Sequence, residues 1–95
     1  MLTNQQITII VETMKPFNPL KIGIFGSVAR GEEHQDSDID ILYEFKEPVG
    51  LFKLIGLKQR MEQLLHRKID LVSEKYLNPK LKSHVMRDLN LIYEG

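Results

Sequence analysis

Short segments in which apolar and polar residues alternate are interleaved along this chain with longer segments in which apolar residues recur every three to four positions. Alternation is typical of a β-strand with one buried face, whereas the longer period is typical of an amphipathic helix. Strands separated by helices predict an α/β or α+β fold, in which a small mixed β-sheet is flanked by helices. The expected elements, in chain order, are a helix over residues 3–14, a strand over 20–25, a short helix over 27–30, a strand over 38–43, a helix over 51–66, a strand over 68–72, a helix over 79–89 and an edge strand over 91–93.

Local signals set two of these helix starts. Thr3 and Gln6 have the spacing of a capping box, in which each side chain bonds the backbone N–H group of the other residue. Asn78 is a good N-cap, and the proline that follows it suits the first turn of the last helix. The residues predicted to face the core from the first strand and the last helix are Leu20, Ile22 and Ile24, and Leu81, Val85 and Leu89.

The length and composition predict one small domain. A chain of 95 residues, of which 42% are hydrophobic and 27% charged, has the composition of an average globular protein and leaves no room for two separate cores. We therefore expect a single domain over residues 1–95. A core of this size is thin, so a ligand-binding cleft is expected at its edge rather than inside it.

The charged residues balance in number but not in position. The 13 basic and 13 acidic side chains argue against strong direct binding of nucleic acid through bulk charge. Residues 1–50 hold 4 basic and 8 acidic side chains, whereas residues 51–95 hold 9 and 5. Two interpretations stay open for the basic half: ordinary solvated helix faces, or a surface that receives an acidic partner or a polyphosphate.

Cysteine is absent, which excludes disulfide bonds and thiolate metal sites and is compatible with a reducing compartment. No apolar segment approaches the ~20 residues that span a membrane, and no signal-peptide pattern opens the chain. We therefore expect a soluble, cytoplasmic protein that makes no contact with a membrane.

Two aspartates occupy alternate positions at the start of the second predicted strand. Residues two apart in a strand point to the same face, so the carboxylates of Asp38 and Asp40 are expected to converge. Two like charges repel unless a cation lies between them, and oxygen-only ligands suit Mg²⁺. The alternative is a solvated strand end, although aspartate is depleted in strands. Asp70 lies in the otherwise apolar third strand and offers a third carboxylate if that strand pairs with the second; otherwise it is an ordinary surface aspartate.

The first strand runs into a glycine turn that is suited to bind an anion. A strand that ends at Gly26 and Ser27 and enters a helix presents free backbone N–H groups, and the serine hydroxyl adds a further donor. Arg30, one turn later, reaches the same place with its guanidinium group. A phosphate group fits such a site, but the same turn also occurs as a purely structural feature. His34, between this turn and the aspartates, is expected to be exposed to solvent.

Gly26, Ser27 and the Asp38-x-Asp40 pair, with ten residues between the serine and the first aspartate, resemble the Gly-Ser-x10-Asp-x-Asp signature of the DNA polymerase beta nucleotidyltransferase superfamily. The resemblance extends over nearly the whole chain and points to the minimal nucleotidyltransferases, many of which are antitoxins paired with HEPN-domain toxins. It implies a polymerase-beta-like nucleotidyltransferase fold, ATP as substrate and two Mg²⁺ ions as cofactors.

The same resemblance implies a role for each residue singled out above. Asp38 and Asp40 would bind the two Mg²⁺ ions, and Asp70 would complete the metal-binding triad and help to deprotonate the attacking hydroxyl. The residues that would hold the triphosphate are Gly26, Ser27 and Arg30.

For function, the resemblance implies transfer of AMP from ATP to a hydroxyl, that of a tyrosine, on a cognate HEPN toxin, so that the chain acts as its antitoxin. Two alternatives stay open: an antitoxin that neutralises its toxin by complex formation without catalysis, and transfer of a nucleotide to a small molecule or to RNA. A HEPN toxin is the partner in both antitoxin hypotheses. Association into homo-oligomers or hetero-oligomers is also expected, because a thin domain exposes apolar residues.

Overall fold

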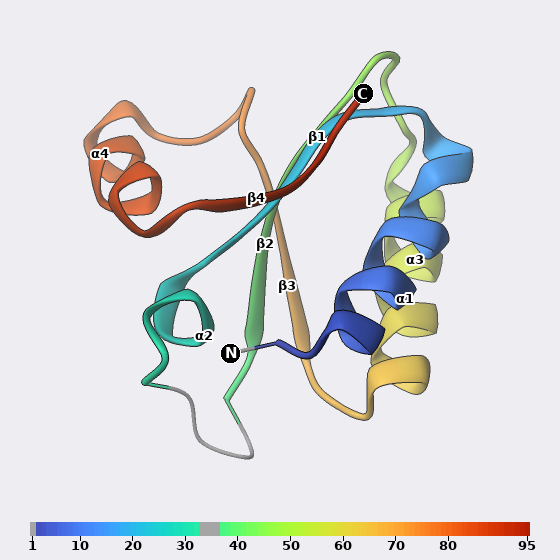
Figure 1. Ribbon diagram of the computed structural model, residues 1–95. Coiled ribbons are helices and arrows are strands. Elements are labelled where there is room, and N and C mark those ends of the chain that lie inside the picture. Colours follow the sequence, from blue (N-terminus) through green and yellow to red (C-terminus); the bar gives the residue numbers. More distant parts are fainter. Residues whose placement is uncertain (1, 33–36) are drawn as a thin grey trace.

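The computed structural model describes residues 2–32 and 37–95 (Figure 1), so His34 lies outside the described residues. The elements are α1 (Asn4–Met14), the 3-10 helix η1 (Lys15–Phe17), β1 (Pro19–Phe25), α2 (Gly26–Arg30), β2 (Ile39–Phe45), α3 (Leu51–Leu65), β3 (Ile69–Ser73), α4 (Pro79–Asp88) and β4 (Asn90–Glu94). Every predicted helix and strand is present, with ends that differ from the prediction by one or two residues at most. In the described part of the chain, no helix combines the length and the apolar character that crossing a membrane requires.

The described strands form one four-stranded sheet in the order β3-β2-β1-β4. β1 pairs antiparallel with β2 and with β4, whereas β2 and β3 pair in parallel. A parallel pair needs a long crossover connection, and α3 supplies it between β2 and β3. This mixed sheet with its helices confirms the predicted fold class.

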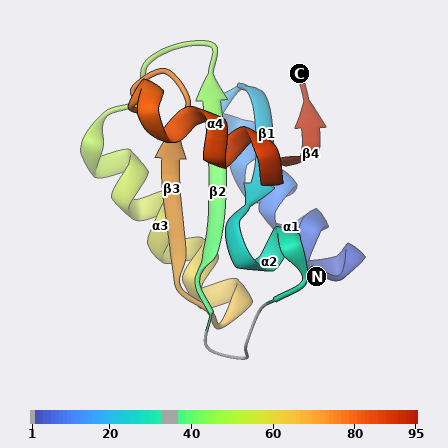
Figure 2. The same cartoon turned by 90° about the vertical axis from the view of Figure 1, so that its left-hand side faces the viewer.

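Helices cover both faces of the sheet, but the two layers differ in what they bury. α1 and α3 lie side by side on one face, and α2 and α4 lie on the other (Figures 1 and 2). Most of the buried core lies between the sheet and the α1–α3 layer; it includes Ile10, Met14, Leu57, Met61 and Leu65 from the helices and Ile22, Ile24, Ile39, Ile41, Tyr43 and Ile69 from the strands. Burial of one large aliphatic side chain stabilises a fold by about 1.5–3 kcal/mol. The α1–α3 face therefore supplies most of the apolar stabilisation, and the α2–α4 face is left with room for polar groups.

The start of α1 confirms the predicted capping box. The backbone N–H of Gln6 donates to Oγ1 of Thr3 at 3.1 Å, and the backbone N–H of Thr3 donates to Oε1 of Gln6 at 2.9 Å. Two donors that the first helical turn leaves unpaired are satisfied in this way. The helix then buries Ile10 and Met14 completely.

Two residues that the sequence predicts to face the core, Leu20 and Leu81, are exposed instead. Leu20 is 41% exposed, because the register between β1 and β2 shifts at the start of β1. Leu81 is 54% exposed. Leu89 lies just beyond α4 in an extended conformation and is half-buried, with its side chain against Gly23 of β1. The predicted stripe of three core residues along the last helix is therefore wrong, and Val85 is the one buried residue of α4.

Candidate functional site

The strand register places two of the predicted site residues next to each other. Asp40 of β2 and Asp70 of β3 are direct partners in the parallel ladder. Ile39 and Ile41 point into the core, so the alternation of side chains turns Asp40 to the opposite face of the sheet. Direct partners on neighbouring parallel strands project to the same face. The prediction that pairing of these strands brings Asp70 beside Asp40 is therefore confirmed.

A third carboxylate, that of Asp38, interacts electrostatically with Asp40. Asp38 lies one position before β2 and is exposed, whereas Asp40 is half-buried. The surroundings raise the pKa of Asp40: burial is the largest cause, the carboxylates of Asp70 and Asp38 follow, and the positive charge of Arg30 acts in the opposite direction. Asp38, Asp40 and Asp70 thus form one carboxylate cluster on the α2–α4 face of the sheet.

β1 brings a glycine directly against this carboxylate cluster. Phe25, the last residue of β1, pairs with Asp40, and Gly26 follows it as the first residue of α2. Gly26 has a φ of 77°, a left-handed conformation that glycine adopts without strain. A Cβ atom at this position would overlap Oδ2 of Asp40 and lie 3.2 Å from its Cγ. Glycine is therefore required both by the backbone conformation and by the space that Asp40 occupies.

The turn that the sequence predicts to bind an anion is present as a local structure. α2 has 5 residues and begins without a side-chain cap. The first N–H groups of a helix have no partner inside it, so they are available to a ligand or to water. Ser27 is half-buried at this end of α2. Because Gly26 abuts Asp40, these donors begin beside the carboxylate cluster.

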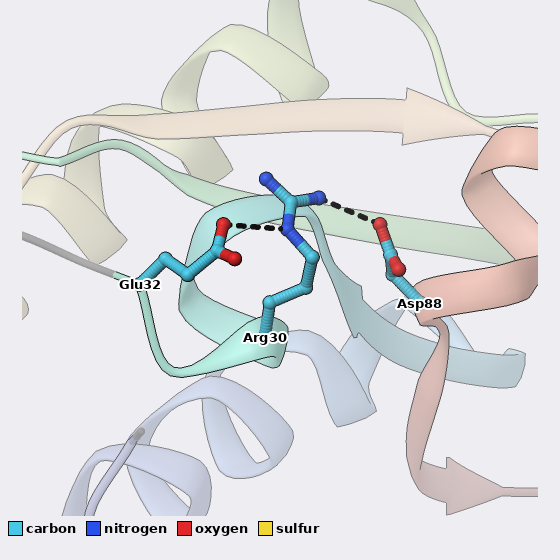
Figure 3. A network of polar contacts seen from close by, with 3 residues as sticks. All are labelled: Arg30, Glu32 and Asp88. Carbon is cyan, nitrogen blue, oxygen red and sulfur yellow. Dashed lines mark hydrogen bonds and ion pairs between the residues drawn. The ribbon is translucent and has the colours of Figure 1, made fainter.

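Arg30 lies at the other end of α2 and is held between two carboxylates (Figure 3). Its Nε donates to Oε2 of Glu32 at 2.9 Å, and its Nη1 donates to Oδ2 of Asp88 at 2.7 Å. Both bonds raise the pKa of Arg30, and the bond to Glu32 has the larger effect. Asp88 is 58 residues away at the end of α4, and no local sequence signal pointed to it. These two bonds use two of the five N–H donors of the guanidinium group, so Arg30 keeps donors with which it could contact a phosphate.

A second contact that the sequence did not reveal fixes the backbone around Asp38. Arg67, in the turn between α3 and β3, donates to the carbonyl oxygen of Ser37 from Nη2 at 2.7 Å and from Nε at 3.2 Å. The backbone N–H of Ile39 donates to the carbonyl oxygen of Lys68 at 2.9 Å. Both neighbours of Asp38 are therefore anchored to the same turn. An arginine 30 residues further along the chain carries no periodic or motif signal that would connect it with the aspartates.

The chemistry of the carboxylate cluster suits Mg²⁺. All its ligands are oxygens, and a divalent cation would relieve the repulsion between carboxylates that, together with the larger effect of burial, raises the pKa of Asp40. Within residues 2–32 and 37–95, no group of three acidic or histidine side chains is already arranged to hold a metal ion by itself. Mg²⁺ commonly keeps water molecules and takes phosphate oxygens of a substrate as further ligands, so an open arrangement of this kind fits it.

A cavity of about 870 Å³ lies on the opposite face of the sheet, between α1 and α3. Ile9, Phe17 and Leu57 contribute to its lining. Among its described lining residues the one carboxylate is Glu12, whose Oε1 is 3.6 Å from Nζ of Lys15. The other ionisable side chains of the described lining are the basic Lys53 and Arg60, so the cavity offers no second carboxylate beside Glu12. The candidate active site is therefore the carboxylate cluster with the Gly26 turn.

Comparisons with known proteins match the sequence over most of its length. The family model of the nucleotidyltransferase domain matches residues 5–92. The protein adenylyltransferase MntA of Thermococcus cleftensis is 38% identical over 94 residues, which cover 94% of this chain and 95% of that protein.

Two solved structures share the architecture. A crystal structure of a toxin-antitoxin with AMP-PNP has a TM-score of 0.84 at 22% identity, over 94% of this chain and 73% of that one. A structure of tri-AMPylated Shewanella oneidensis HEPN toxin in complex with MNT antitoxin has a TM-score of 0.79 at 18% identity, over 99% and 74% of the two chains. At these identities the structures establish the fold, which is the polymerase-beta-like fold that the sequence predicts. The family match over residues 5–92, on a sheet that sets a Gly-Ser turn against paired aspartates, shows that this chain belongs to the nucleotidyltransferase domain family as a minimal nucleotidyltransferase.

Proposed function

We propose that this chain is a protein adenylyltransferase that transfers AMP from ATP to a tyrosine hydroxyl of a HEPN toxin and thereby acts as its antitoxin. The observation that carries the proposal is the direct pairing of Asp40 with Asp70 beside Gly26. The relative from T. cleftensis is named a protein adenylyltransferase, and an AMPylated HEPN toxin is present in one structure of the same fold. Both support an enzyme whose acceptor is a protein.

In the proposed reaction, the acceptor hydroxyl oxygen forms a bond to the α-phosphorus of ATP, and the bond from that phosphorus to the bridging oxygen breaks, so that pyrophosphate leaves. Asp38, Asp40 and Asp70 would hold two Mg²⁺ ions, which supply stabilisation of negative charge on the phosphates when they are bound. Asp70 is exposed on β3, the last strand at its edge of the described sheet, and a substrate hydroxyl can therefore approach it. We assign to its carboxylate the acceptance of the hydroxyl proton.

The remaining predicted residues would orient the nucleotide. The Gly26-Ser27 turn would donate backbone N–H groups and the serine hydroxyl to the triphosphate, and Arg30 would add charge-assisted hydrogen bonds. In this scheme the chain contributes position and electrostatics, and no side chain forms a covalent intermediate.

An antitoxin that only binds its toxin is the second candidate, because a toxin-antitoxin complex is among the structures with this fold. The carboxylate cluster argues against it. Burial and, after it, the neighbouring carboxylates raise the pKa of Asp40, which destabilises the folded chain at neutral pH, and binding alone gives no reason to keep these carboxylates together.

The test is the intact mass of a co-expressed HEPN toxin after incubation with this chain, Mg²⁺ and each nucleoside triphosphate in turn. We expect a gain of one or more adenylyl groups with ATP, at a tyrosine identified by peptide mass spectrometry. The gain should vanish with Asp38→Asn and persist with Glu94→Gln, a matched loss of charge on the exposed end of β4. A stable complex with no gain in mass would replace this proposal with the binding antitoxin.

A further inference from the structure

α4 presents a row of basic side chains on its outer side. Lys80, His84 and Arg87 follow one another at intervals of four and three residues, which places them on one side of a helix. All three are exposed, whereas Val85 of the same helix is buried.

The acidic residues nearest to this row in the sequence are engaged elsewhere. Asp88 bonds Arg30 at 2.7 Å, and Glu74 forms an ion pair with Lys21 at 2.8 Å. Among the ion pairs of the described residues, none involves Lys80 or Arg87. The positive charge of α4 is therefore not neutralised by the described part of the chain.

Exposed apolar groups accompany the basic row. Tyr76, in the loop that leads to α4, is 80% exposed, and Leu81 is 54% exposed. Tyr76 lies in a hollow that no residue of α4 lines, whereas Leu81 is three residues before His84 on the helix itself. We refer to Lys80, Leu81, His84 and Arg87 together as the α4 surface. Arginine is enriched where proteins bind each other, and a mixture of apolar and charged side chains is typical of such interfaces.

The α4 surface belongs to the same layer as the candidate active site. Figure 2 shows α4 lying across the face of the sheet on which α2 lies, and Asp40 projects from that face toward Gly26 of α2. A protein acceptor that presents a hydroxyl to the carboxylate cluster therefore approaches the side of the molecule that carries α4. The exposed lysines of α3, Lys53 and Lys58, lie on the opposite side of the sheet.

We propose that the α4 surface is the docking surface for the protein acceptor, and that the acceptor binds it through an acidic patch beside the hydroxyl that is modified. This inference rests on the proposed function for the identity of the acceptor. Charge complementarity selects the partner, because unpaired basic side chains attract an acidic surface over about one Debye length, or ~8 Å at physiological salt.

A nucleic acid fits the same surface less well. A phosphate backbone that continued from α4 across this face would meet the repulsive charges of Asp38, Asp40 and Asp70. The whole chain also carries equal numbers of basic and acidic residues. A folded protein, in contrast, offers a local acidic patch together with an apolar surface for Leu81.

The experiment measures binding of the chain to an immobilised HEPN toxin without ATP, and then the kinetics of AMP transfer to that toxin. The test variant is Lys80→Glu/Arg87→Glu, and the matched control is Lys53→Glu/Lys58→Glu on α3, which makes the same change of net charge on the other face. We expect the test variant to weaken binding and to raise the KM for the toxin by about tenfold or more. The kcat at saturating toxin, the affinity for ATP and the unfolding temperature should match those of the control.

Raising the salt concentration should weaken toxin binding by the natural chain more than binding by the test variant, because salt screens the attraction. Equal effects of the α4 and α3 variants, or no effect of either, would overturn the inference. Retention of an RNA oligonucleotide that depends on Lys80 and Arg87, with toxin binding unchanged, would also overturn it. Toxin binding that depends on α4, without any transfer of AMP by the natural chain, would support the docking surface and refute the proposed function.

Discussion

Gly26 provides a sharp test of the site, because the chain contains a second glycine with nearly the same backbone conformation. The φ angles of Gly26 and Gly31 are 77° and 75°; Gly26 is the first residue of α2, and Gly31 directly follows its last residue. A Cβ atom on Gly26 would overlap Oδ2 of Asp40, whereas one on Gly31 would meet no described atom within 4 Å. Gly31→Ala therefore imposes the backbone strain alone, and Gly26→Ala adds the contact with the carboxylate cluster.

The two substitutions should differ more in activity than in stability. A left-handed conformation lowers the free energy of unfolding by about 1–2 kcal/mol for an L-amino acid other than glycine. Replacing glycine by alanine also raises it by ~0.4–1 kcal/mol, because alanine restricts the unfolded chain. A net loss of about 1 kcal/mol lowers the unfolding temperature of a domain of this size by about 4–8 °C. The overlap at Gly26 adds about 1–3 kcal/mol if nothing moves. Asp40 can relieve this overlap by rotating its carboxylate. The stability is then regained, but the carboxylate no longer lies where it would bind a metal ion.

We therefore expect Gly31→Ala to retain AMP transfer and Gly26→Ala to lose most of it, at a temperature at which both variants are folded. Thermal unfolding measured by circular dichroism gives the stability, and the mass of the toxin gives the transfer. Equal transfer by the two variants would refute the reasoning that Gly26 makes room for a catalytic carboxylate. A loss of transfer that is explained fully by unfolding of the Gly26→Ala variant would refute the same reasoning.

Three further predictions concern the side chains around this glycine. Asp40→Asn should raise the unfolding temperature in metal-free buffer while abolishing transfer. Because folding raises the pKa of Asp40, the ionised carboxylate lowers the free energy of unfolding. This penalty is absent below about pH 4, where the carboxyl is protonated in both the folded and the unfolded chain, and it grows as the pH rises through the folded pKa. A stability gain that does not change with pH would contradict this. Asp88→Asn should strengthen ATP binding, measured by titration calorimetry, because it removes one of the two carboxylates that hold Arg30; weaker binding would instead mean that Asp88 positions Arg30. Arg67→Met should lower kcat more than it changes the KM for ATP, and Arg67→Lys should restore part of kcat, because the side chain holds the carbonyl oxygen of Ser37 and acts on the metal ligands through the backbone.

The sequence predicted the sheet and the pairing of the aspartates because both depend on local periodicity. Alternation around Ile39 and Ile41 determines which way Asp40 points, and the apolar run around Asp70 marks a strand that is buried on one side. The parallel pairing then follows from the helix between the two strands. None of these steps needs knowledge of a contact between distant side chains.

The contacts that the sequence missed are of the opposite kind. Arg30 meets Asp88 across 58 residues, and Arg67 meets Ser37 across 30. Surface arginines have no fixed spacing from their partners, so pattern reasoning has nothing to detect. The end of α4 was missed for a related reason: helical periodicity continues through Leu89, but the backbone becomes extended there, one residue before β4 begins.

The two faces of the sheet explain how so small a domain tolerates its carboxylate cluster. Burial and, after it, like charges raise the pKa of Asp40 and so reduce stability at neutral pH. The total stability of a small domain is only about 5–15 kcal/mol. The cost is limited because Asp38 and Asp70 are exposed and water screens their charges. This loss of stability is offset because the residues that alternate with the aspartates along β2 point to the opposite face of the sheet. Ile39 and Ile41 therefore lie in the core on the α1–α3 side, with 0% exposure. The same alternation that aims the carboxylates at one point therefore also buries the side chains that hold the strand in place.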